Sequence, residues 1–461
     1  MLWIGVAMAE RTIAAVATPL GEGSVGVIRI SGSEAFGVAD NVFKSVSGKK
    51  IKDIAGYTAL FGEVYSDDGR IDEAVALKFV APKSYTGENV VEISVHGGTL
   101  MVKEVLRAVL KGGAVLAAPG EFTKRAFLNG KIDLVKAESV MGLIKARSMS
   151  ELKISSSVHA GSTSKQLDAI EKNIVSAAAS IAAYCDYPEE DLGEINTDTF
   201  IKELSAVASS LEKMLNEYDA GKILREGIET VIIGRPNVGK STLMNLLSGR
   251  ERSIVTDIAG TTRDIIEDTV MLGDVPLRLA DTAGIRDSND EVEKVGVDLA
   301  RQRLSSSQLV LAVFDASGKP SRKDKELLDE CKDKPLIVIL NKCDKQGANF
   351  DEAFAKGTEV VRMSAKTGEG INALKDAVAR VTLTEQLSPD SAILVSERQR
   401  SLAERALYSV NEALSCIKSG VTPDAVGVCV DDALTSLYEL TGKRVTETVT
   451  QEIFSRFCVG K

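Results

Sequence analysis

The sequence has few of the residues that build metal sites. It contains two histidines and six cysteines in 461 residues, and no two cysteines form a C-x-x-C pair. This argues against a zinc site, and we expect free thiols of the kind kept in a reducing cytosol. The histidines are His96 and His159, and the cysteines are Cys185, Cys331, Cys343, Cys416, Cys429 and Cys458.

The sequence also lacks an excess of basic residues and a long apolar run. Its 66 acidic residues outnumber its 56 basic ones, which gives a net charge of −10. This balance argues against non-specific wrapping of nucleic acid, although it leaves a local basic patch open. The apolar start "MLWIGVAM" is too short for a signal peptide or a membrane span, and Met8 is an alternative start. We predict a cytoplasmic protein without a membrane segment.

The length of the chain exceeds what one hydrophobic core accommodates and indicates about three domains. The β-rich runs "SVGVIRISG", "YTALFGEVY" and "VVEISVHGG" predict a small α+β domain over residues 1–131. Apolar residues then recur at helical spacing in two stretches, 132–226 and 385–461, which predict one all-α domain in two parts. The block between them, 227–384, alternates strands and helices and predicts an inserted α/β domain with a mostly parallel sheet.

The inserted block opens with a phosphate-binding motif. "GRPNVGKS", Gly234 to Ser241, fits G-x-x-x-x-G-K-[ST], follows a predicted strand and precedes a predicted helix. The glycines let main-chain N–H groups surround the phosphates, and the following helix presents its positive end to them. We expect Lys240 to neutralise the β- and γ-phosphates and Ser241 to ligate Mg²⁺. The motif therefore predicts a Ras-like P-loop domain.

A second motif selects the base. In "NKCD", Asn341 to Asp344, the carboxylate of Asp344 can accept from both N1–H and the 2-amino group of guanine, a donor pair that adenine lacks. "SAK", Ser364 to Lys366, follows the next strand and supplies the accompanying loop. The motifs predict GTP or GDP binding. The predicted nucleotide-binding residues are Asn237, Val238, Gly239, Lys240, Ser241, Thr242, Thr256, Asp257, Ile258, Ala259, Gly260, Thr261, Thr262, Asp281, Thr282, Ala283, Gly284, Asn341, Lys342, Asp344, Ser364, Ala365 and Lys366.

A glutamine that Ras-like enzymes use is missing. After "DTAG" they place the glutamine that orients the attacking water, whereas this chain has Ile285. Asp281 can hold Mg²⁺ through water, and Thr262 is the candidate switch threonine that completes the metal shell. Asn237 could help to cage a monovalent cation where an arginine finger otherwise places positive charge. The alternative is that Asn237 only hydrogen-bonds its own loop.

Several motifs together resemble the MnmE (TrmE) family of tRNA-modifying GTPases. They are "ATPLGEGSVGVIRISG", "GRPNVGKST", "IVTDIAGTTRD", "DTAGIRD" and the ending "FCVGK", which occur in this order over essentially the whole chain. The resemblance implies that the N-terminal domain has a folate-binding fold, binds a formyl-tetrahydrofolate and forms a homodimer. It places folate contacts at Arg29, Glu92, Lys131 and Lys461. Without the family, surface ion pairs or solvated lysines would be the favoured explanation of these side chains.

The resemblance also implies how hydrolysis proceeds without the glutamine. It assigns K⁺ contacts to Asn237, Thr256, Ile258 and Thr261, and the general base to Glu293, although Asp290 and Glu291 are indistinguishable from it by spacing alone. Arg263 and Arg286 are expected in the switch segments, with ordinary surface roles as the alternative. Cys458, inside "FCVGK", is a possible thiol of the modification site or a small packed residue. These catalytic assignments rest on the motif match.

The output implied by the resemblance is carboxymethylaminomethyl modification at C5 of the wobble uridine of certain tRNAs. A partner, MnmG (GidA), is expected to carry FAD, since this chain shows no G-x-G-x-x-G before a helix. Two alternatives stay open at this point. One is an Era-like ribosome-assembly GTPase, which would not predict the N-terminal domain or "FCVGK". The other is a folate-dependent aminomethyltransferase with a regulatory GTPase domain.

Overall fold

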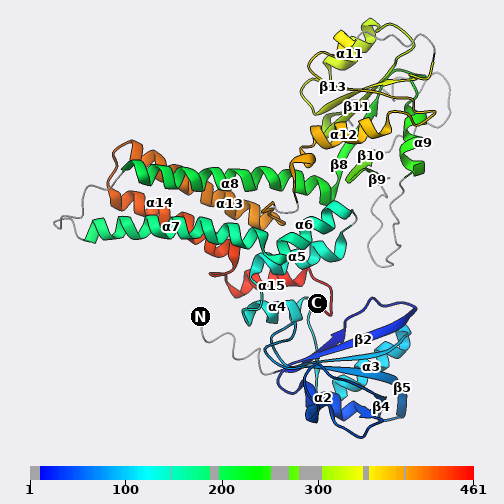
Figure 1. Ribbon diagram of the computed structural model, residues 1–461, viewed down its shortest axis with the longest axis vertical. Helices are drawn as coiled ribbons and strands as arrows, with labels where there is room; N and C mark the ends of the chain where they lie inside the picture. Colours follow the sequence, from blue (N-terminus) through cyan, green and yellow to red (C-terminus); the bar gives the residue numbers. More distant parts are fainter. Residues whose placement is uncertain are drawn as a thin grey trace. The chain divides into compact units, whose positions relative to one another are not determined.

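The computed structural model describes residues 11–146, 148–186, 197–250, 269–279, 304–345, 352–388 and 391–461. Contacts divide the chain into two compact units (Figure 1). The first combines Met1–Met141 with Leu434–Lys461, and the second is Gly142–Ala433. These two units do not coincide with the four segments that were predicted from the sequence. The bounds of those segments were placed where the predicted type of fold changes, and they stay predictions.

The first unit is built on a seven-stranded sheet in the order β3-β4-β5-β6-β2-β1-β7. All neighbouring strands are antiparallel except β1 and β7, which are parallel. The strands are β1 Ile13–Val16, β2 Gly23–Ser31, β3 Phe43–Ser45, β4 Ala59–Ser66, β5 Gly69–Phe79, β6 Val90–Gly97 and β7 Val115–Leu116. The β-rich runs in the sequence therefore do form strands, and the predicted α+β fold is confirmed.

Two helices, α2 (Ala35–Val42) and α3 (Thr99–Lys111), share a hydrophobic core with one face of this sheet. The alternation in β2 explains which face: Ile28 and Ile30 are fully buried in that core, so Arg29 between them points to the opposite face. A short 3₁₀ helix, η1 (Ile51–Asp53), also contacts α2. The side of the sheet that carries Arg29 is thus left uncovered by these helices.

The C-terminal end of the chain packs on the N-terminal half of the same unit. Helix α15 (Glu447–Ser455) contacts α4 (Glu121–Leu128), and Phe454 and Phe457 share a core with Leu134. Gly120 lies under this contact in the left-handed region, at φ +66°, and a Cβ there would lie 2.6 Å from the Phe454 carbonyl oxygen. Close packing of the C-terminal segment therefore requires glycine at this position.

The second unit contains long helices that flank the inserted sheet in sequence. They are α6 Met149–Ala160, α7 Ser162–Asp186, α8 Thr197–Glu226, α13 Glu397–Lys418 and α14 Pro423–Thr441, whose last residues belong to the first unit. Helix α5 (Leu134–Lys145) also crosses the boundary between the units. Helices α8 and α13 lie side by side, although the insertion separates them in sequence (Figure 1). The predicted all-α fold of this domain is confirmed.

The inserted domain has a six-stranded sheet in the order β13-β12-β11-β8-β10-β9. Every neighbouring pair is parallel except β9 and β10. The strands are β8 Ile228–Ile233, β9 Thr269–Leu272, β10 Val275–Leu279, β11 Leu309–Asp315, β12 Leu336–Asn341 and β13 Glu359–Arg362; the helices are α9 Lys240–Arg250, α11 Arg322–Asp329 and α12 Ile371–Val381, with 3₁₀ turns η3 Glu352–Ala355 and η4 Thr384–Gln386. Separate hydrophobic cores cover its two faces. This confirms the predicted α/β sheet.

Among the described helices, none is apolar over a length that would span a bilayer. The described parts of the chain also contain no group of three or more metal-ligating side chains close enough to hold a metal ion. All six cysteines are free.

Candidate functional site: a guanine-nucleotide pocket and a charged cluster on the N-terminal sheet

The phosphate loop connects the end of β8 to the start of α9. Three residues of this loop have positive φ angles: +150° at Gly234, +63° at Asn237 and +101° at Gly239. A Cβ on Gly239 would lie 2.2 Å from Asn341 Nδ2, and one on Gly234 would lie 2.3 Å from the Val313 carbonyl oxygen. The motif glycines are therefore required both by conformation and by close packing against the ends of β11 and β12.

Lys240 is the first residue of α9 and folds back across this loop. Its Nζ donates to the carbonyl oxygens of Gly234 at 2.6 Å and Arg235 at 2.9 Å. Burial lowers the pKa of the amine. Ser241 and Thr242 follow in the first turn of the helix and are exposed. The exposed hydroxyl of Ser241 beside a helix N-terminus fits a ligand of Mg²⁺ next to a bound phosphate.

The base-recognition motif is held to the phosphate loop by side chains. Asn341, almost fully buried at the end of β12, donates from Nδ2 to the Val238 carbonyl at 2.8 Å and accepts at Oδ1 from the Ala365 N–H at 2.8 Å. One amide thus joins the phosphate loop, "NKCD" and "SAK". These three motifs are far apart in the sequence, and the structure brings them together.

Lys342 adds a second link between the same elements. It adopts φ +69°, and its Nζ donates to the Asn237 carbonyl at 2.5 Å and to Asp315 Oδ2 at 2.6 Å. Burial opposes ionisation of Asp315, but hydrogen bonds from Lys342 and Ser317 outweigh it and lower the pKa of Asp315 to about 2. Asp315 was not among the predicted site residues, although its position at the end of the buried strand β11 was a usable signal.

Asp344 has the environment that guanine recognition needs. The hydroxyl of Ser364 hydrogen-bonds to its carboxylate and lowers its pKa, and the nearby charges of Lys366 and Lys345 act in the same direction. The carboxylate is exposed, whereas Ser364 is buried. Asp344 is therefore ionised at neutral pH and free to accept two hydrogen bonds from a base.

The other predicted nucleotide and catalytic residues lie outside the described residues. They are Thr256, Asp257, Ile258, Ala259, Gly260, Thr261, Thr262, Arg263, Asp281, Thr282, Ala283, Gly284, Arg286 and Glu293. Ile285 lies outside as well.

A second charged cluster lies on the face of the N-terminal sheet opposite α2 and α3. Arg29 on β2 and Glu92 on β6 are cross-strand partners, and Arg29 Nε lies 2.8 Å from Glu92 Oε1. The guanidinium also lies over the rings of Tyr85 and Phe122, at 5.2 and 5.6 Å from their centroids. The two aromatic residues were not predicted, since neither belongs to a periodic pattern or a motif that the sequence analysis used.

The C-terminus reaches this cluster. Arg29 Nη1 donates to the carbonyl of Gly460 at 3.4 Å, across 431 positions of sequence. Gly460 has φ +96°, and a Cβ there would lie 2.1 Å from the Val16 carbonyl oxygen on β1. Burial lowers the pKa of the neighbouring Lys461, and the positive charge of Arg29 lowers it further. The structure thus gathers Arg29, Glu92 and Lys461.

Two further predicted residues have more peripheral positions. Lys131 is exposed and donates from Nζ to the Pro82 carbonyl at 3.0 Å, at the start of the loop that carries Tyr85. Cys458 has an exposed side chain, and its carbonyl accepts from the Gly120 N–H at 3.3 Å. Its main chain therefore anchors the C-terminal segment, and its thiol is accessible.

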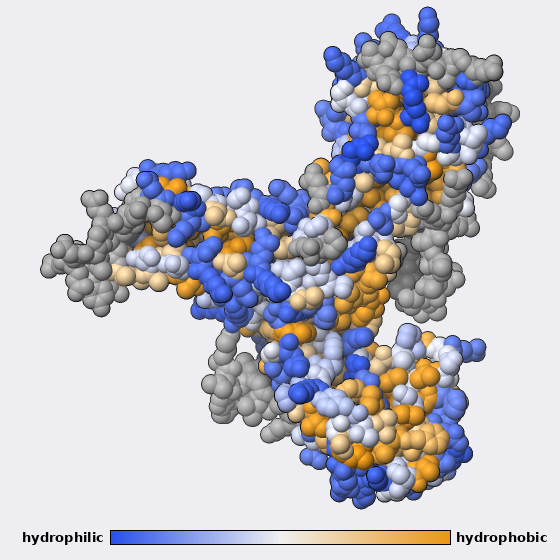
Figure 2. Space-filling view, viewed as in Figure 1, coloured by the Kyte–Doolittle hydropathy of each residue, from blue (hydrophilic) through white to orange (hydrophobic). Residues whose placement is uncertain are grey.

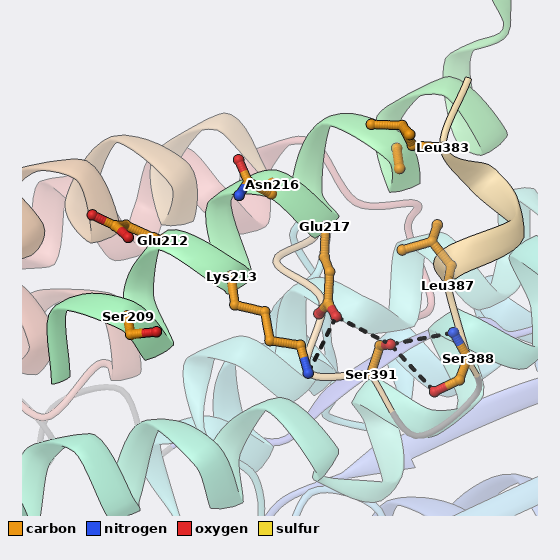
Figure 3. A pocket seen from close by; sticks show the side chains of 10 residues that line it. Ser209, Glu212, Lys213, Asn216, Glu217, Leu383, Leu387, Ser388 and Ser391 are labelled. Atoms are coloured by element: carbon orange, nitrogen blue, oxygen red, sulfur yellow. Dashed lines mark hydrogen bonds and ion pairs between the residues drawn. The ribbon is translucent and has the colours of Figure 1, made fainter. Parts of the chain in front are cut away.

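A cavity of about 490 Å³ lies elsewhere, between α8 and the segment that returns from the inserted domain (Figure 3). Its charged lining is largely paired within itself: Glu217 lies 3.8 Å from Lys213 and accepts from Ser391 at 3.4 Å. None of the predicted site residues lines it. We assign no function to this cavity.

Comparison with known proteins gives matches over nearly the whole chain. Residues 12–131 match the family model "GTP-binding protein TrmE N-terminus", and residues 134–458 match "MnmE helical domain". The tRNA modification GTPase MnmE of Acetivibrio thermocellus is 40% identical over 459 residues, which cover 98% of this chain and 99% of that protein. The protein of the same name from Clostridioides difficile is 40% identical over 456 residues, with the same coverage.

Solved structures also match, over part of the chain. Era of Aquifex aeolicus bound to GDP and aluminium fluoride is 26% identical, covering 40% of this chain and 66% of that chain, at a TM-score of 0.25. The family models and the full-length relatives carry the assignment. The chain is a GTP hydrolase that takes GTP or GDP with Mg²⁺, and it belongs to the MnmE family of tRNA modification GTPases.

Proposed function

We propose that this GTPase drives carboxymethylaminomethyl modification at C5 of the wobble uridine of certain tRNAs in the cytoplasm. In this proposal a flavin-containing partner, MnmG (GidA), supplies FAD and a tetrahydrofolate supplies the one-carbon unit. The observation that carries it is the return of the C-terminal "FCVGK" segment to Arg29 and Glu92. An Era-like GTPase that binds no folate would not need such a cluster.

The charged cluster suits a folate. Arg29 and Lys461 can bind the glutamate carboxylates, and Glu92 can accept from the amino and N–H groups of the pterin. The ring of Tyr85 beside Arg29, which is 36% exposed, adds flat apolar surface for a heterocycle, and the buried ring of Phe122 supports Arg29 from below. Lys131, at the rim of the same loop, would add a further positive charge for a carboxylate tail. A bound (6S)-5-formyl-tetrahydrofolate or a related tetrahydrofolate would supply a one-carbon unit.

An apolar surface beside this cluster supports a homodimer. Phe61 on β4 and Val75 on β5 are cross-strand partners and are 56% and 40% exposed. Val75 pairs with Ser94 and Ser94 with Val27, two residues from Arg29, so this surface lies on the face of the sheet that carries Arg29. Figure 2 shows hydrophobic residues over this N-terminal domain. We propose that two copies pair through it.

Hydrolysis without the glutamine is assigned to residues of the family motifs. Lys240 holds the β- and γ-phosphates, Ser241 and Thr262 hold Mg²⁺, and Glu293 accepts the proton of water. Asn237, Thr256, Ile258 and Thr261 would hold a K⁺ ion, which supplies the positive charge of an arginine finger. Arg263 and Arg286 would act in the switch segments, and two nucleotide-bound domains would meet across the dimer.

This catalytic proposal has two tests. Glu293→Ala should reduce GTP turnover while GTP affinity is nearly kept, and exchange of K⁺ for Na⁺ should slow hydrolysis by the unaltered protein. Equal rates in the two salts would remove the cation from the mechanism. If Glu293→Ala hydrolyses GTP at the normal rate, Glu293 is not the general base.

The output is tested in a strain from which the gene has been deleted. Nucleoside mass spectrometry of its tRNA should show loss of carboxymethylaminomethyluridine, and a copy of the gene should restore it. Intact modification in the deletion strain would reject the proposal in favour of a ribosome-assembly GTPase or an aminomethyltransferase.

A further inference from the structure

The second residue of the phosphate loop, Arg235, makes a contact that the family motifs do not explain. Its Nε lies 2.6 Å from Asp324 Oδ1. Asp324 belongs to helix α11, 89 positions further along the chain (324 − 235), and its side chain is 2% exposed, whereas that of Arg235 is 40% exposed. A buried carboxylate of the inserted domain is thus aimed at the loop that holds the phosphates.

The remaining bonds of Asp324 fix it in place. Its Oδ2 accepts from the N–H and the hydroxyl of Ser321, both at 2.8 Å, and its own N–H is capped by the Ser321 hydroxyl at 3.3 Å. This reciprocal capping box occupies one carboxylate oxygen completely. Among the described residues, neither Asp324 Oδ1 nor Arg235 Nε has a hydrogen bond of good geometry, so each depends on the charge of the other.

The main chain of Arg235 is part of the nucleotide site. Its carbonyl, with that of Gly234, accepts from the Nζ of Lys240. The position of the Arg235 side chain therefore bears on the position of the carbonyls that orient the phosphate-binding amine. Since α11 is rigidly capped, its first turn is a fixed point to which the loop can be tied.

We propose that Arg235 and Asp324 are a positioning pair that holds the phosphate loop in its nucleotide-binding conformation. The pair contacts neither phosphate nor base and acts through Lys240 and the loop backbone. A loop arranged before the ligand arrives loses less conformational freedom on binding. The pair therefore strengthens binding of GDP and GTP alike and leaves the rate of hydrolysis at saturation largely unchanged. This inference rests on the GTPase activity and is independent of the tRNA chemistry.

The variant that tests the pair is Asp324→Asn, which removes the charge and keeps an oxygen for the cap. The probe is a fluorescent N-methylanthraniloyl derivative of GDP, with GTP turnover measured in parallel. We expect the dissociation constant and the KM for GTP to rise by about 5- to 20-fold, because the loss of one charge breaks the ion pair, with kcat within about twofold. Unchanged affinity would overturn the proposal.

Three further variants separate positioning from general stability. Ser321→Ala removes one of the two hydrogen bonds to Asp324 Oδ2 but keeps the ion pair, and should lower the melting temperature while reducing affinity less than Asp324→Asn does. Arg235→Lys should retain more affinity than Arg235→Met, because it keeps the charge. The double variant Arg235→Met/Asp324→Asn should bind no more weakly than Arg235→Met alone. Additive losses, or an equal loss of affinity in Ser321→Ala, would contradict the pair.

Discussion

The nucleotide pocket and the charged cluster on the N-terminal sheet are assembled in opposite ways. The pocket comes from short motifs at the ends of β8, β12 and β13 in one sheet, and the side chain of Asn341 contacts both of the other motifs. The cluster comes from two neighbouring strands and from the last residues of the chain, joined across 431 positions. The residues of the pocket can therefore be recognised from short sequence motifs, whereas the cluster forms only when the C-terminal segment packs on the N-terminal sheet.

This difference makes the two sites separable by mutation. Changes in the motifs should abolish nucleotide chemistry and leave folate binding intact, and changes in the C-terminal contact should do the reverse.

The largest effect is expected for Lys240→Ala. It removes the amine that bridges the loop carbonyls and would face the phosphates, so GTP turnover should fall by about 10²- to 10³-fold. Lys323→Ala, which changes an exposed lysine on α11, is the matched control and should keep full turnover. Tetrahydrofolate binding should be the same in both variants. Turnover by Lys240→Ala near the control rate would contradict the assignment.

Asp344→Asn should change the base that is bound. The ionised carboxylate accepts two N–H groups of guanine, and an amide can accept only one while donating to a carbonyl. We expect GTP affinity to fall by about 10²-fold or more and binding of xanthosine triphosphate to appear. Competition between the two nucleotides measures the change. Retained preference for GTP would mean that Asp344 does not contact the base.

Arg29→Met should affect only the second site. It removes the partner of Glu92 and a candidate ligand for a carboxylate, so tetrahydrofolate affinity should fall by about 10- to 100-fold at unchanged GTP turnover. Arg107→Met, which breaks an exposed pair with Glu104, is the control. Isothermal titration with 5-formyl-tetrahydrofolate gives the affinities. Equal affinity in the two variants would place the folate elsewhere.

Gly460→Ala tests the packing of the chain end. A Cβ would lie 2.1 Å from the Val16 carbonyl, at a φ that alanine rarely adopts, so the C-terminal residues should leave the cluster. Folate affinity should fall several-fold, by roughly 1 kcal/mol. Gly48→Ala has a similar φ of +71° with nothing within 4 Å of the added carbon, and should bind normally. If Gly48→Ala lowered folate affinity more than Gly460→Ala, the C-terminus would not be part of the folate site.

The effect of Asp315→Asn is expected on the stability of the fold. Hydrogen bonds from Lys342 and Ser317 hold the folded pKa of Asp315 at about 2, below the unfolded value of 3.8. The carboxylate therefore stabilises the fold above pH 3.8, by about 1–2 kcal/mol, and this contribution disappears as the pH falls towards 2. Unfolding at pH 7 and at pH 3 should show a smaller difference between variant and parent at the lower pH. A constant difference would exclude the ionised pair.

The parts of the fold that were predictable are those with a strong local pattern. The buried runs of β11 and β12 and the alternation in β2 indicated strands, and "GRPNVGKS" indicated the loop between β8 and α9. The elements that were missed are short or lack a pattern. β7 has two residues and depends on its pairing with β1, and β9 has four residues and is an edge strand beside β10.

The same distinction applies to the sites. The motifs predicted that Asn341 and the phosphate loop belong to one nucleotide site, and strand ends of a parallel sheet share one edge. No local pattern predicted that Gly460 would reach Arg29 or that Tyr85 and Phe122 would flank it, because those contacts depend on packing between distant segments. The pair of Arg235 and Asp324 is of the same long-range kind.

The central claim is that GTP hydrolysis by this chain is required for wobble-uridine modification. The most direct measurement is nucleoside mass spectrometry of tRNA from a deletion strain that carries either Lys240→Ala or the control Lys323→Ala at equal protein levels. The account predicts that carboxymethylaminomethyluridine is absent with Lys240→Ala and present at the normal level with Lys323→Ala. The same amount of modified uridine in both strains would contradict it.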